Sequence, residues 1–330
     1  MKPLTTLASK FYSATMAYRN RRFDRGDRVV DVGRPVISVG NVTMGGTGKT
    51  PTVQWIVRLL QARGHLPLVA LRGYAAGKPQ LSDEAMEHEQ MLPGVPVLAD
   101  PDRVGAIEAF LKKDPSRDVV VLDDGFQHRF VARQLDLVLI DARRSLDAER
   151  VFPAGRLREP LSSLSRATDV LVTHAASVDP VLRKRISMLH GRDPTAWCDH
   201  VWTGLSRFDV DGETTLDTLS GIRVITRLGI AAAEGVRNQI VEAGGVIVAD
   251  VAARDHAPVT ASEMQRLAEA CTRADALLVT GKDWVKLQPL VDWSALQVPV
   301  LVPRLTLNFV SGQEELERRL LGVFASSESA

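Results

Sequence analysis

The sequence predicts an α/β fold built on a mostly parallel sheet with helices on both faces. Short apolar runs alternate with helical stretches from residue 35 to 190, and continuous apolar strands of this kind are typical of a buried sheet. A glycine-rich segment, residues 43–50, lies between the first strand and the next helix, which is the order of a phosphate-binding loop. A second alternating set follows residue 220 and predicts a smaller α/β domain.

The composition is that of a globular protein of 330 residues, a length sufficient for two domains. With 45% apolar and 25% charged residues, the chain lies outside the disordered class. The net charge of +1 provides no overall attraction to nucleic acid. Cys198 and Cys271 are far apart and suggest neither a disulfide framework nor a zinc site. No apolar run approaches the ~18 residues of a membrane span.

An N-terminal helix is predicted by apolar and aromatic residues that recur at spacings of three and four. These residues are Leu4, Leu7, Ala8, Phe11, Tyr12, Thr15 and Tyr18, and the arginines that follow them are Arg19, Arg21, Arg22, Arg25 and Arg28. An aromatic face with a basic flank is typical of a helix on an anionic lipid surface. A first helix packed on the core, with its arginines in water, explains the pattern equally well.

Strands of the first domain are expected at residues 36–39, 68–71, 95–98, 119–122, 136–140 and 170–173. Helices are expected at residues 51–63, 83–91, 103–111 and 180–190. A parallel sheet binds ligands at the carboxyl ends of its strands. We therefore expect the chemistry in the loops that follow residues 36–39, 68–71 and 119–122.

A change of pattern at residues 200–220 predicts a β-ribbon hinge, because Asp211-Gly212 is a strong hairpin signal between two β-rich runs. The expected organisation is an N-terminal helix with its basic flank at 1–28, a P-loop NTPase-like core at 29–199, the ribbon at 200–220 and a C-terminal α/β domain at 221–330. In this last domain we expect strands at 222–225, 246–249, 276–280 and 299–302, and helices at 230–243, 262–271 and near 313–322.

The expected phosphate-binding loop consists of Thr43, Met44, Gly45, Gly46, Thr47, Gly48, Lys49 and Thr50. Glycines let backbone N–H groups turn toward an anion, and the following helix N-terminus adds partial positive charge. We expect Lys49 on the β- and γ-phosphates of a nucleoside triphosphate and the Thr50 hydroxyl on Mg²⁺. The usual motif has glycine where this chain has Thr43.

The apolar strand at residues 119–122 ends in two carboxylates, Asp123 and Asp124. An aspartate at this position of a P-loop protein holds Mg²⁺, and the sequence does not rank the two. A turn after a core strand is the alternative interpretation. Gln127 and His128 follow directly, and residues 152–160 form a charged loop that could also be a solvated surface segment.

These segments resemble the tetraacyldisaccharide 4'-kinases, also called lipid A 4'-kinases. Residues 38–51 resemble the signature loop of that family, in which threonine at position 43 is normal. Residues 123–128 match a second hallmark and residues 157–161 a third. Further similar segments are Arg72-Gly73-Tyr74, Ser82-Asp83-Glu84, Asp255-His256 and residues 282–287, and departures from the family pattern include Ala75, Ala85 and Gly281.

The resemblance implies a membrane-associated P-loop kinase with two α/β domains. Its reaction would transfer the γ-phosphate of ATP to the 4'-hydroxyl of a tetraacylated glucosamine disaccharide-1-phosphate in lipid A biosynthesis. The implied cofactors are ATP and Mg²⁺, with no nucleic acid and no obligate protein partner. The implied location is peripheral, at the cytoplasmic face of the inner membrane, with the N-terminal helix on the membrane surface.

The resemblance also implies residues on the acceptor side. Asp83 would be the general base, with His256 hydrogen-bonded to it, whereas the alternatives are a helix N-cap and a surface loop residue. Because these two residues belong to different domains, closure about the ribbon would complete the site. The substrate contacts would be Tyr74, Glu84, Gln127, His128 and Glu159.

Two other functions fit a phosphate-binding loop. A regulatory ATPase switch that dimerises on nucleotide commonly has an early lysine in its loop, and Asn41-Val42-Thr43-Met44 has none. A kinase of a soluble small metabolite would share the site but would not need a lipid-facing N-terminus. The sequence does not predict acyl-chain preference, oligomeric state or the residues that bind the 1-phosphate.

Overall fold

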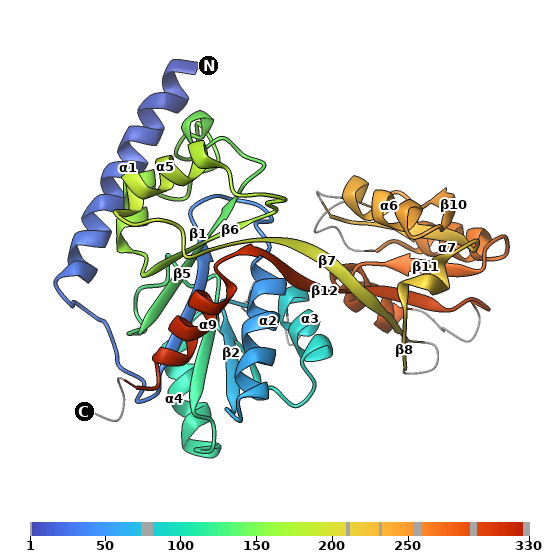
Figure 1. The fold of residues 1–330 in the computed structure, drawn as a ribbon, viewed down its shortest axis with the longest axis horizontal. Helices are drawn as coiled ribbons and strands as arrows, with labels where there is room; N and C mark the ends of the chain where they lie inside the picture. Colours follow the sequence, from blue (N-terminus) through green and yellow to red (C-terminus); the bar gives the residue numbers. More distant parts are fainter. Residues whose placement is uncertain are drawn as a thin grey trace. The chain divides into compact units, whose positions relative to one another are not determined.

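The chain forms two compact units in a computed structural model that describes residues 2–73, 82–208, 212–230, 233–253, 259–290 and 296–325. Unit 1 comprises Met1–His200 and Leu307–Ala330, and unit 2 comprises Val201–Thr306 (Figure 1). The chain passes between the units twice, in strands β7 (Ala196–Arg207) and β12 (Val300–Ser311). The sequence places residues 221–330 in one domain, whereas the structure groups the closing segment with unit 1, because apolar side chains of that segment pack into the core of unit 1.

Unit 1 is built on a parallel sheet. Its strands, besides β7, are β1 (Val36–Asn41), β2 (Pro67–Leu71), β3 (Val97–Ala99), β4 (Val119–Asp123), β5 (Leu135–Asp141) and β6 (Asp169–Thr173). Their order is β7-β6-β5-β1-β4-β2-β3. Val39 of β1 pairs with Asp123 on one side and Leu137 on the other. The carboxyl end of β1 therefore lies between those of β4 and β5.

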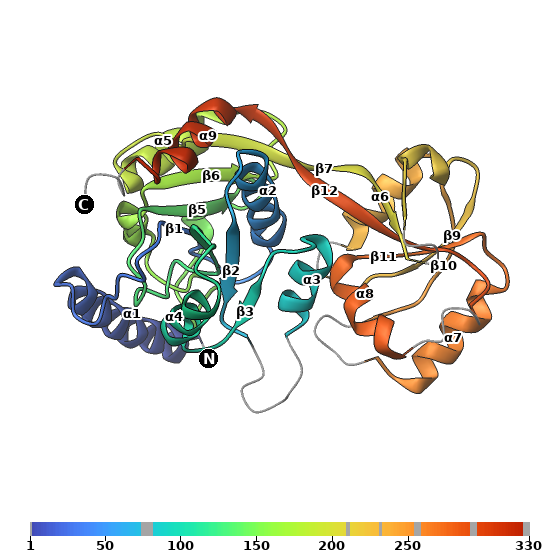
Figure 2. The same ribbon diagram turned by 90° about the horizontal axis from the view of Figure 1, so that it is seen from below.

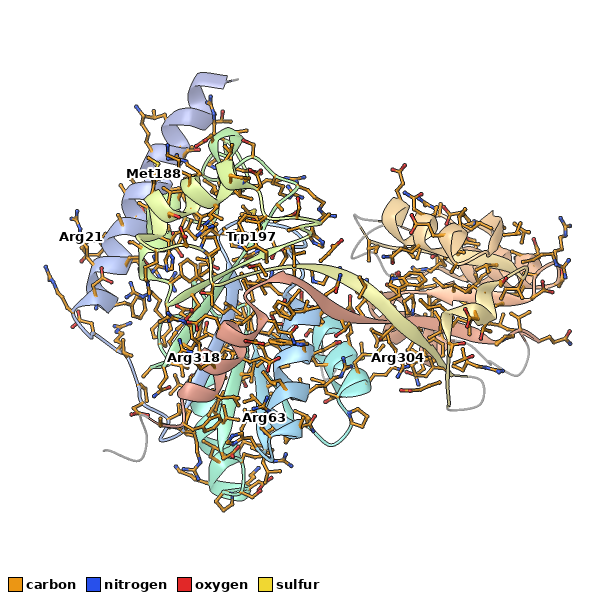
Figure 3. The ribbon with its side chains drawn as sticks, in the orientation of Figure 1. Arg21, Arg63, Met188, Trp197, Arg304 and Arg318 are labelled. Atoms are coloured by element: carbon orange, nitrogen blue, oxygen red, sulfur yellow. The ribbon has the colours of Figure 1, made fainter. Side chains whose placement is uncertain are left out.

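Helices cover both faces of this sheet (Figure 2). They are α1 (Lys2–Asp24), α2 (Lys49–Ala62), α3 (Asp83–Met91), α4 (Arg103–Lys113), α5 (Pro180–His190) and α9 (Gln313–Gly322), with 3-10 turns η1 (Leu146–Ala148) and η2 (Leu161–Arg166). Side chains of successive strand residues point to opposite faces. Ile37 packs with α2, α3 and α9, whereas Val36 packs with α4 and Val138 with α5. The buried Trp197 of β7 joins the α5 cluster (Figure 3).

Unit 2 contains a further set of parallel strands with its own helices. Its elements are β8 (Gly212–Thr214), η3 (Leu216–Leu219), β9 (Arg223–Arg227), α6 (Ala233–Glu242), β10 (Val246–Asp250), α7 (Ala261–Cys271), β11 (Ala276–Val279), α8 (Gly281–Leu287) and η4 (Gln288–Leu290). Parallel strands follow the order β10-β9-β11-β12. β8 pairs antiparallel with β7, with Arg207 opposite Gly212, as the hairpin signal indicates.

The predicted α/β class is confirmed, and several elements have the expected bounds. α3 and α5 occupy residues 83–91 and 180–190 as expected, and α2 begins two residues earlier than expected, at Lys49. The sequence did not predict α8, a short helix capped by Thr280, whose hydroxyl accepts the Asp283 N–H. Seven residues are too few to show helical periodicity, which explains the omission.

Helix α1 packs on unit 1 with one side and exposes the other. Ser9, Met16 and Phe23 are buried at intervals of two helical turns. Leu7, Phe11 and Tyr18 are 66%, 77% and 66% exposed, and Arg21 points away from the body of unit 1 (Figure 3). None of the described helices combines the length and apolar character needed to cross a bilayer.

The core of unit 2 contains a buried group of charges. Arg227 donates to Glu263 over 2.8 Å and pairs with Asp283 through Nη1. Asp283, which is fully buried, also accepts the N–H of Gly229 and the hydroxyl of Thr280. Removal of Asp283 from this group would leave several buried donors without an acceptor.

We expect Asp283→Ala to lower the free energy of unfolding by about 3–5 kcal/mol, because the Gly229 N–H, the Thr280 hydroxyl and Nη1 of Arg227 lose a buried acceptor, although Glu263 still pairs with Arg227. Urea denaturation followed by circular dichroism measures the change. The control is Asp275→Ala, which removes the solvent-exposed partner of Arg223 and should leave the midpoint near that of the wild type. Equal midpoints for the two variants would contradict the structural role of Asp283.

Candidate active site

The phosphate-binding loop joins the buried strand β1 to α2, as the sequence predicts. The loop turns through glycines in the left-handed region, with φ +109° at Gly45 and φ +80° at Gly48, which precedes the helix. A Cβ at Gly48 would lie 2.3 Å from Cε1 of His200. Both the backbone conformation and the close approach of this imidazole therefore require glycine at position 48.

Thr43 occupies the position at which the usual motif has glycine, and the structure gives the reason. It forms an antiparallel bridge with Leu157, so its backbone is extended. The Met44 N–H donates to the Arg156 carbonyl over 2.7 Å, and the Arg158 N–H donates to the Val42 carbonyl over 2.8 Å. A β-branched residue fits an extended bridge, and the charged loop is thereby attached to the start of the phosphate-binding loop.

Thr47 is buried and holds the middle of the loop. Its hydroxyl accepts from Asn41 Nδ2 over 2.9 Å, and its carbonyl accepts from the Thr173 hydroxyl over 2.9 Å. Asn41 and Thr173 are the last residues of β1 and β6. The loop is therefore fixed by side chains at the carboxyl edge of the sheet.

The two carboxylates at the end of β4 have different surroundings. Asp124, at φ +51°, accepts Nη1 of Arg158 at 2.8 and 2.7 Å and lies 3.4 Å from Lys49 Nζ. Burial alone would raise the pKa of Asp124, but the charges of Lys49 and Arg158 outweigh it and lower that pKa. Asp124 is thus an anion held between two cations.

Asp123 is held by a histidine that the sequence did not indicate. Oδ2 of Asp123 lies 2.9 Å from Nε2 of His88, on α3, and both side chains are almost fully buried. Burial lowers the pKa of His88, whereas the hydrogen bond and charge of Asp123, with Glu87 and Glu84, raise it more, so the net direction is upward. Among the described residues, Oδ1 of Asp123 has no hydrogen-bond partner.

Arginines surround the segment that follows these carboxylates. Burial, together with the charges of Arg103, Arg133, Arg19 and Arg72, lowers the pKa of His128 to about 3. His128 is therefore neutral at physiological pH. The Arg103 guanidinium is itself buried and donates to the Asp124 carbonyl over 3.3 Å. This region has a positive potential suited to phosphate groups.

Two of the expected substrate residues have partners within the protein. Gln127 Nε2 donates to the Asn41 carbonyl over 2.9 Å, and its side-chain oxygen accepts from Arg158. Glu159 is fully buried, binds Arg166 at 2.8 Å and accepts from Asn20 of α1 at 2.7 Å. Glu159 therefore joins α1 to the charged loop, which is a structural contact.

The expected acceptor-side residues are only partly described. Asp83 is the first residue of α3, after the cap Ser82, whose hydroxyl accepts the Ala85 N–H over 3.3 Å, and Glu84 follows in the same turn. Ser82 rather than Asp83 is thus the N-cap. Tyr74 and His256 lie outside the described residues.

The sequence did not single out Arg158, Arg103, His88 or His200. Arg158 lies within a motif that was recognised, so the arginine beside Glu159 was an available signal. The other three reach the site only through tertiary packing, from the last turn of α3, the start of α4 and β7. Sequence spacing does not carry that information.

Comparisons with known proteins are consistent with this geometry. A sequence model described as tetraacyldisaccharide-1-P 4'-kinase matches residues 1–325. The tetraacyldisaccharide 4'-kinase of Chlorobaculum parvum is 33% identical over 341 residues, which cover 96% of this chain and 93% of the relative. That of Geobacter sulfurreducens is 35% identical over 301 residues, which cover 85% and 83%.

A solved structure resembles the whole chain. It is described as a crystal structure of the apo form of LpxK from Aquifex aeolicus in complex with ATP. The TM-score is 0.75 at 25% sequence identity, and the alignment covers 97% of this chain and 98% of the other.

The pair of His88 and Asp123 generates a pH-dependent prediction. A raised pKa of His88 in the folded state adds stability below its unfolded pKa, ~6.5, and this stability is lost as the pH rises through the folded pKa. The difference in unfolding free energy between wild type and His88→Gln should therefore be larger at about pH 6 than at about pH 9. Urea titrations at the two pH values measure it.

Between about pH 6 and about pH 9, the difference in unfolding free energy between wild type and His88→Gln should fall by about 1.4 kcal/mol for each unit by which the pKa of His88 is raised. In an Asp123→Asn background this pH dependence should disappear or reverse, because the partner charge is gone and burial alone lowers the pKa of His88. If the difference in unfolding free energy between wild type and His88→Gln does not change with pH, the pairing of a charged His88 with Asp123 is contradicted.

Proposed function

Because the chain belongs to the tetraacyldisaccharide-1-P 4'-kinase family, we propose that the residues around Lys49 and Asp123 carry out the phosphate transfer of that family. The chain is an ATP-dependent kinase that phosphorylates the 4'-hydroxyl of a tetraacylated disaccharide-1-phosphate in lipid A biosynthesis. The observation that carries the assignment is the match along the chain together with the strand, loop and helix that hold Lys49 beside Asp124. It is favoured over a regulatory ATPase switch or a soluble-metabolite kinase.

The phosphate-binding loop would hold the triphosphate of ATP. Backbone N–H groups of residues 43–50 and the N-terminus of α2 favour an anion at this place. Lys49, now 3.4 Å from Asp124, would turn its ammonium toward the β- and γ-phosphates. Arg158 would keep Asp124 compensated when Lys49 leaves it, because it binds both carboxylate oxygens.

For Mg²⁺, the surroundings favour Asp123 over Asp124 as the direct ligand. Both oxygens of Asp124 accept from Arg158, whereas the buried Oδ1 of Asp123 has no hydrogen-bond partner among the described residues. A buried carboxylate oxygen without a partner fits a hard cation. We therefore assign Asp123 and the Thr50 hydroxyl to Mg²⁺, which would neutralise charge on the phosphate oxygens.

On the acceptor side, Asp83 would remove the proton of the 4'-hydroxyl. Its helix α3 is tied to the metal carboxylate, because His88, five residues later, binds Asp123 at 2.9 Å. The base and the metal ligand thus have a common support. By the family resemblance, His256 would raise the basicity of Asp83, and Tyr74, Glu84, Gln127 and His128 would contact the sugar. Gln127 and the neutral His128 would serve through hydrogen bonds rather than charge.

Helix α1 would place the protein on a membrane surface as a peripheral protein, at the cytoplasmic face of the inner membrane. Its exposed Leu7, Phe11 and Tyr18 lie on one side, opposite the buried Ser9 and Met16. Between α1 and the charged loop lies a hollow of about 490 Å³ lined by Ser9, Ser13, Arg150, Ala154, Leu157 and Leu161, among others. An acylated substrate that stays in the bilayer could reach the protein along this side.

Wild-type protein should move label from γ-labelled ATP into the lipid phase when it is given an acylated disaccharide-1-phosphate. Asp83→Ala should lower kcat by about 100-fold or more at saturating ATP, the effect expected for loss of a general base. The exposed Glu89→Ala, on the same helix, is the matched control and should keep wild-type kcat. Label that remains in water would contradict the kinase assignment. A loss below about tenfold for Asp83→Ala would contradict only its role as base.

Replacement of Leu7, Phe11 and Tyr18 together by serine should weaken binding to anionic phospholipid vesicles at least about tenfold, because three exposed apolar side chains are lost. Vesicle sedimentation measures the binding. The matched control is Val181→Ser with Met188→Ser on α5, which removes two equally exposed apolar side chains elsewhere on unit 1. Unchanged vesicle binding by the triple variant would exclude α1 as the membrane contact.

A further inference from the structure

Two histidines and an aspartate gather beside the phosphate-binding loop, where neither the sequence nor the family relation assigned a function. His174 follows the last residue of β6, and Asp199 and His200 belong to β7, the neighbouring strand. The Ala175 N–H donates to the Cys198 carbonyl over 3.0 Å and fixes the two segments side by side. All three side chains belong to unit 1.

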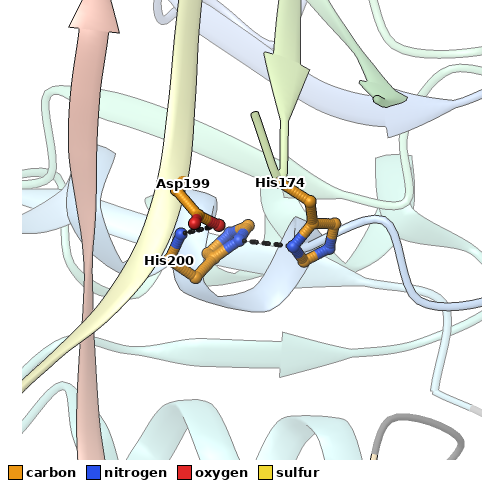
Figure 4. A group of neighbouring side chains, drawn as sticks. All are labelled: His174, Asp199 and His200. Carbon is orange, nitrogen blue, oxygen red and sulfur yellow. Dashed lines mark hydrogen bonds between the residues drawn. The ribbon is translucent and has the colours of Figure 1, made fainter. Parts of the chain in front are cut away.

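The ligand atoms of this group converge. Nδ1 of His174 and Nδ1 of His200 face each other at 3.1 Å, and the carboxylate of Asp199 lies with them inside 4.8 Å (Figure 4). An ion at the usual zinc–nitrogen distance of ~2.0–2.1 Å from both nitrogens would subtend an angle of about 100°, near the tetrahedral value. The two imidazoles therefore already have the separation that a shared transition-metal ion requires.

The backbone and the neighbouring loop hold these side chains in place. The backbone of His174 lies in the left-handed region, with φ +55°, and this sets the direction in which its ring leaves the end of the strand. His200 lies against Gly48, where an added Cβ would be 2.4 Å from its Nε2, and this leaves Nδ1 directed to His174. One oxygen of Asp199 accepts the His200 N–H over 2.8 Å, which leaves the other available as a ligand.

Taken together, the charges near this group favour the binding of a cation. Arg143 lies close, but its Nε and Nη2 donate to the two oxygens of Asp141 at 2.9 Å. Arg144 also pairs with Asp141 and with Glu149. The negative charge of Asp199 therefore remains for an ion. Two imidazoles and one carboxylate are the donor set of zinc-class ions, whereas Mg²⁺ prefers oxygen donors.

We propose that His174, Asp199 and His200 bind one divalent transition-metal ion of the zinc class, at a site separate from that of Mg²⁺. Three protein ligands leave the fourth position to water. Since the ring of His200 packs on Gly48, a bound ion would also fix the surface against which the phosphate-binding loop turns.

The test is a Co²⁺ titration of the full chain without nucleotide, in excess Mg²⁺ to fill oxygen-donor sites, followed by visible absorption. The wild type should develop saturable tetrahedral bands at one equivalent, and Zn²⁺ should abolish them. His174→Asn, which keeps a residue tolerant of positive φ, and Asp199→Asn should each weaken binding at least about tenfold.

The control is His65→Ala, because His65 pairs with Asp118 at 2.8 Å on the surface. This variant tests for non-specific metal binding by a histidine that lies beside a carboxylate. This variant should bind Co²⁺ like the wild type. Zn²⁺ should also raise the melting temperature of the wild type and not that of His174→Asn. Wild-type protein without saturable bands, or variants that bind as tightly as the wild type, would overturn the proposal.

Discussion

Asp124 connects three segments that are far apart in the sequence. Its carboxylate binds Arg158 of the charged loop and Lys49 at the start of α2, and its backbone carbonyl accepts from Arg103 of α4. In a partly buried setting these charges stabilise the ionised carboxylate and lower its pKa. Without this anion, several cations would repel one another around the phosphate-binding loop. The arrangement of the site therefore depends on one aspartate at the tip of a central strand.

The neighbouring Asp123 extends the same support to the acceptor side. The sheet fixes its backbone by pairing with Val39, and His88 fixes its carboxylate from α3. A helix anchored in this way cannot shift its first turn, which carries Asp83, without disturbing the carboxylate assigned to Mg²⁺. Two adjacent aspartates thus have different tasks, because one faces arginine and lysine and the other faces a buried histidine.

The sequence predicts what local pattern determines. Apolar runs and helical periodicity locate most strands and helices, and the glycine loop and the two aspartates follow from residue order alone. The partners of these residues do not, since Arg103, His88 and His200 reach the site across the sheet. The return of residues 307–330 to unit 1 was missed for a related reason, because an amphipathic helix does not encode which sheet face it covers. Glu159 shows the converse, a recognised motif residue that is buried in a contact with Asn20 and Arg166.

The pKa of His128 indicates what the assembled site favours. Burial, which disfavours any charge on the ring, lowers it most, and nearby arginines lower it further, to about 3. The contribution of the arginines is a positive potential, which is favourable for an anion. Part of this positive charge is compensated internally, by Asp124 and by the contact of Arg133 with Asp136. A polyanionic nucleotide and a phosphorylated acceptor would add to the compensation. The arginines that help to exclude a proton from His128 would therefore also favour a phosphate group beside it.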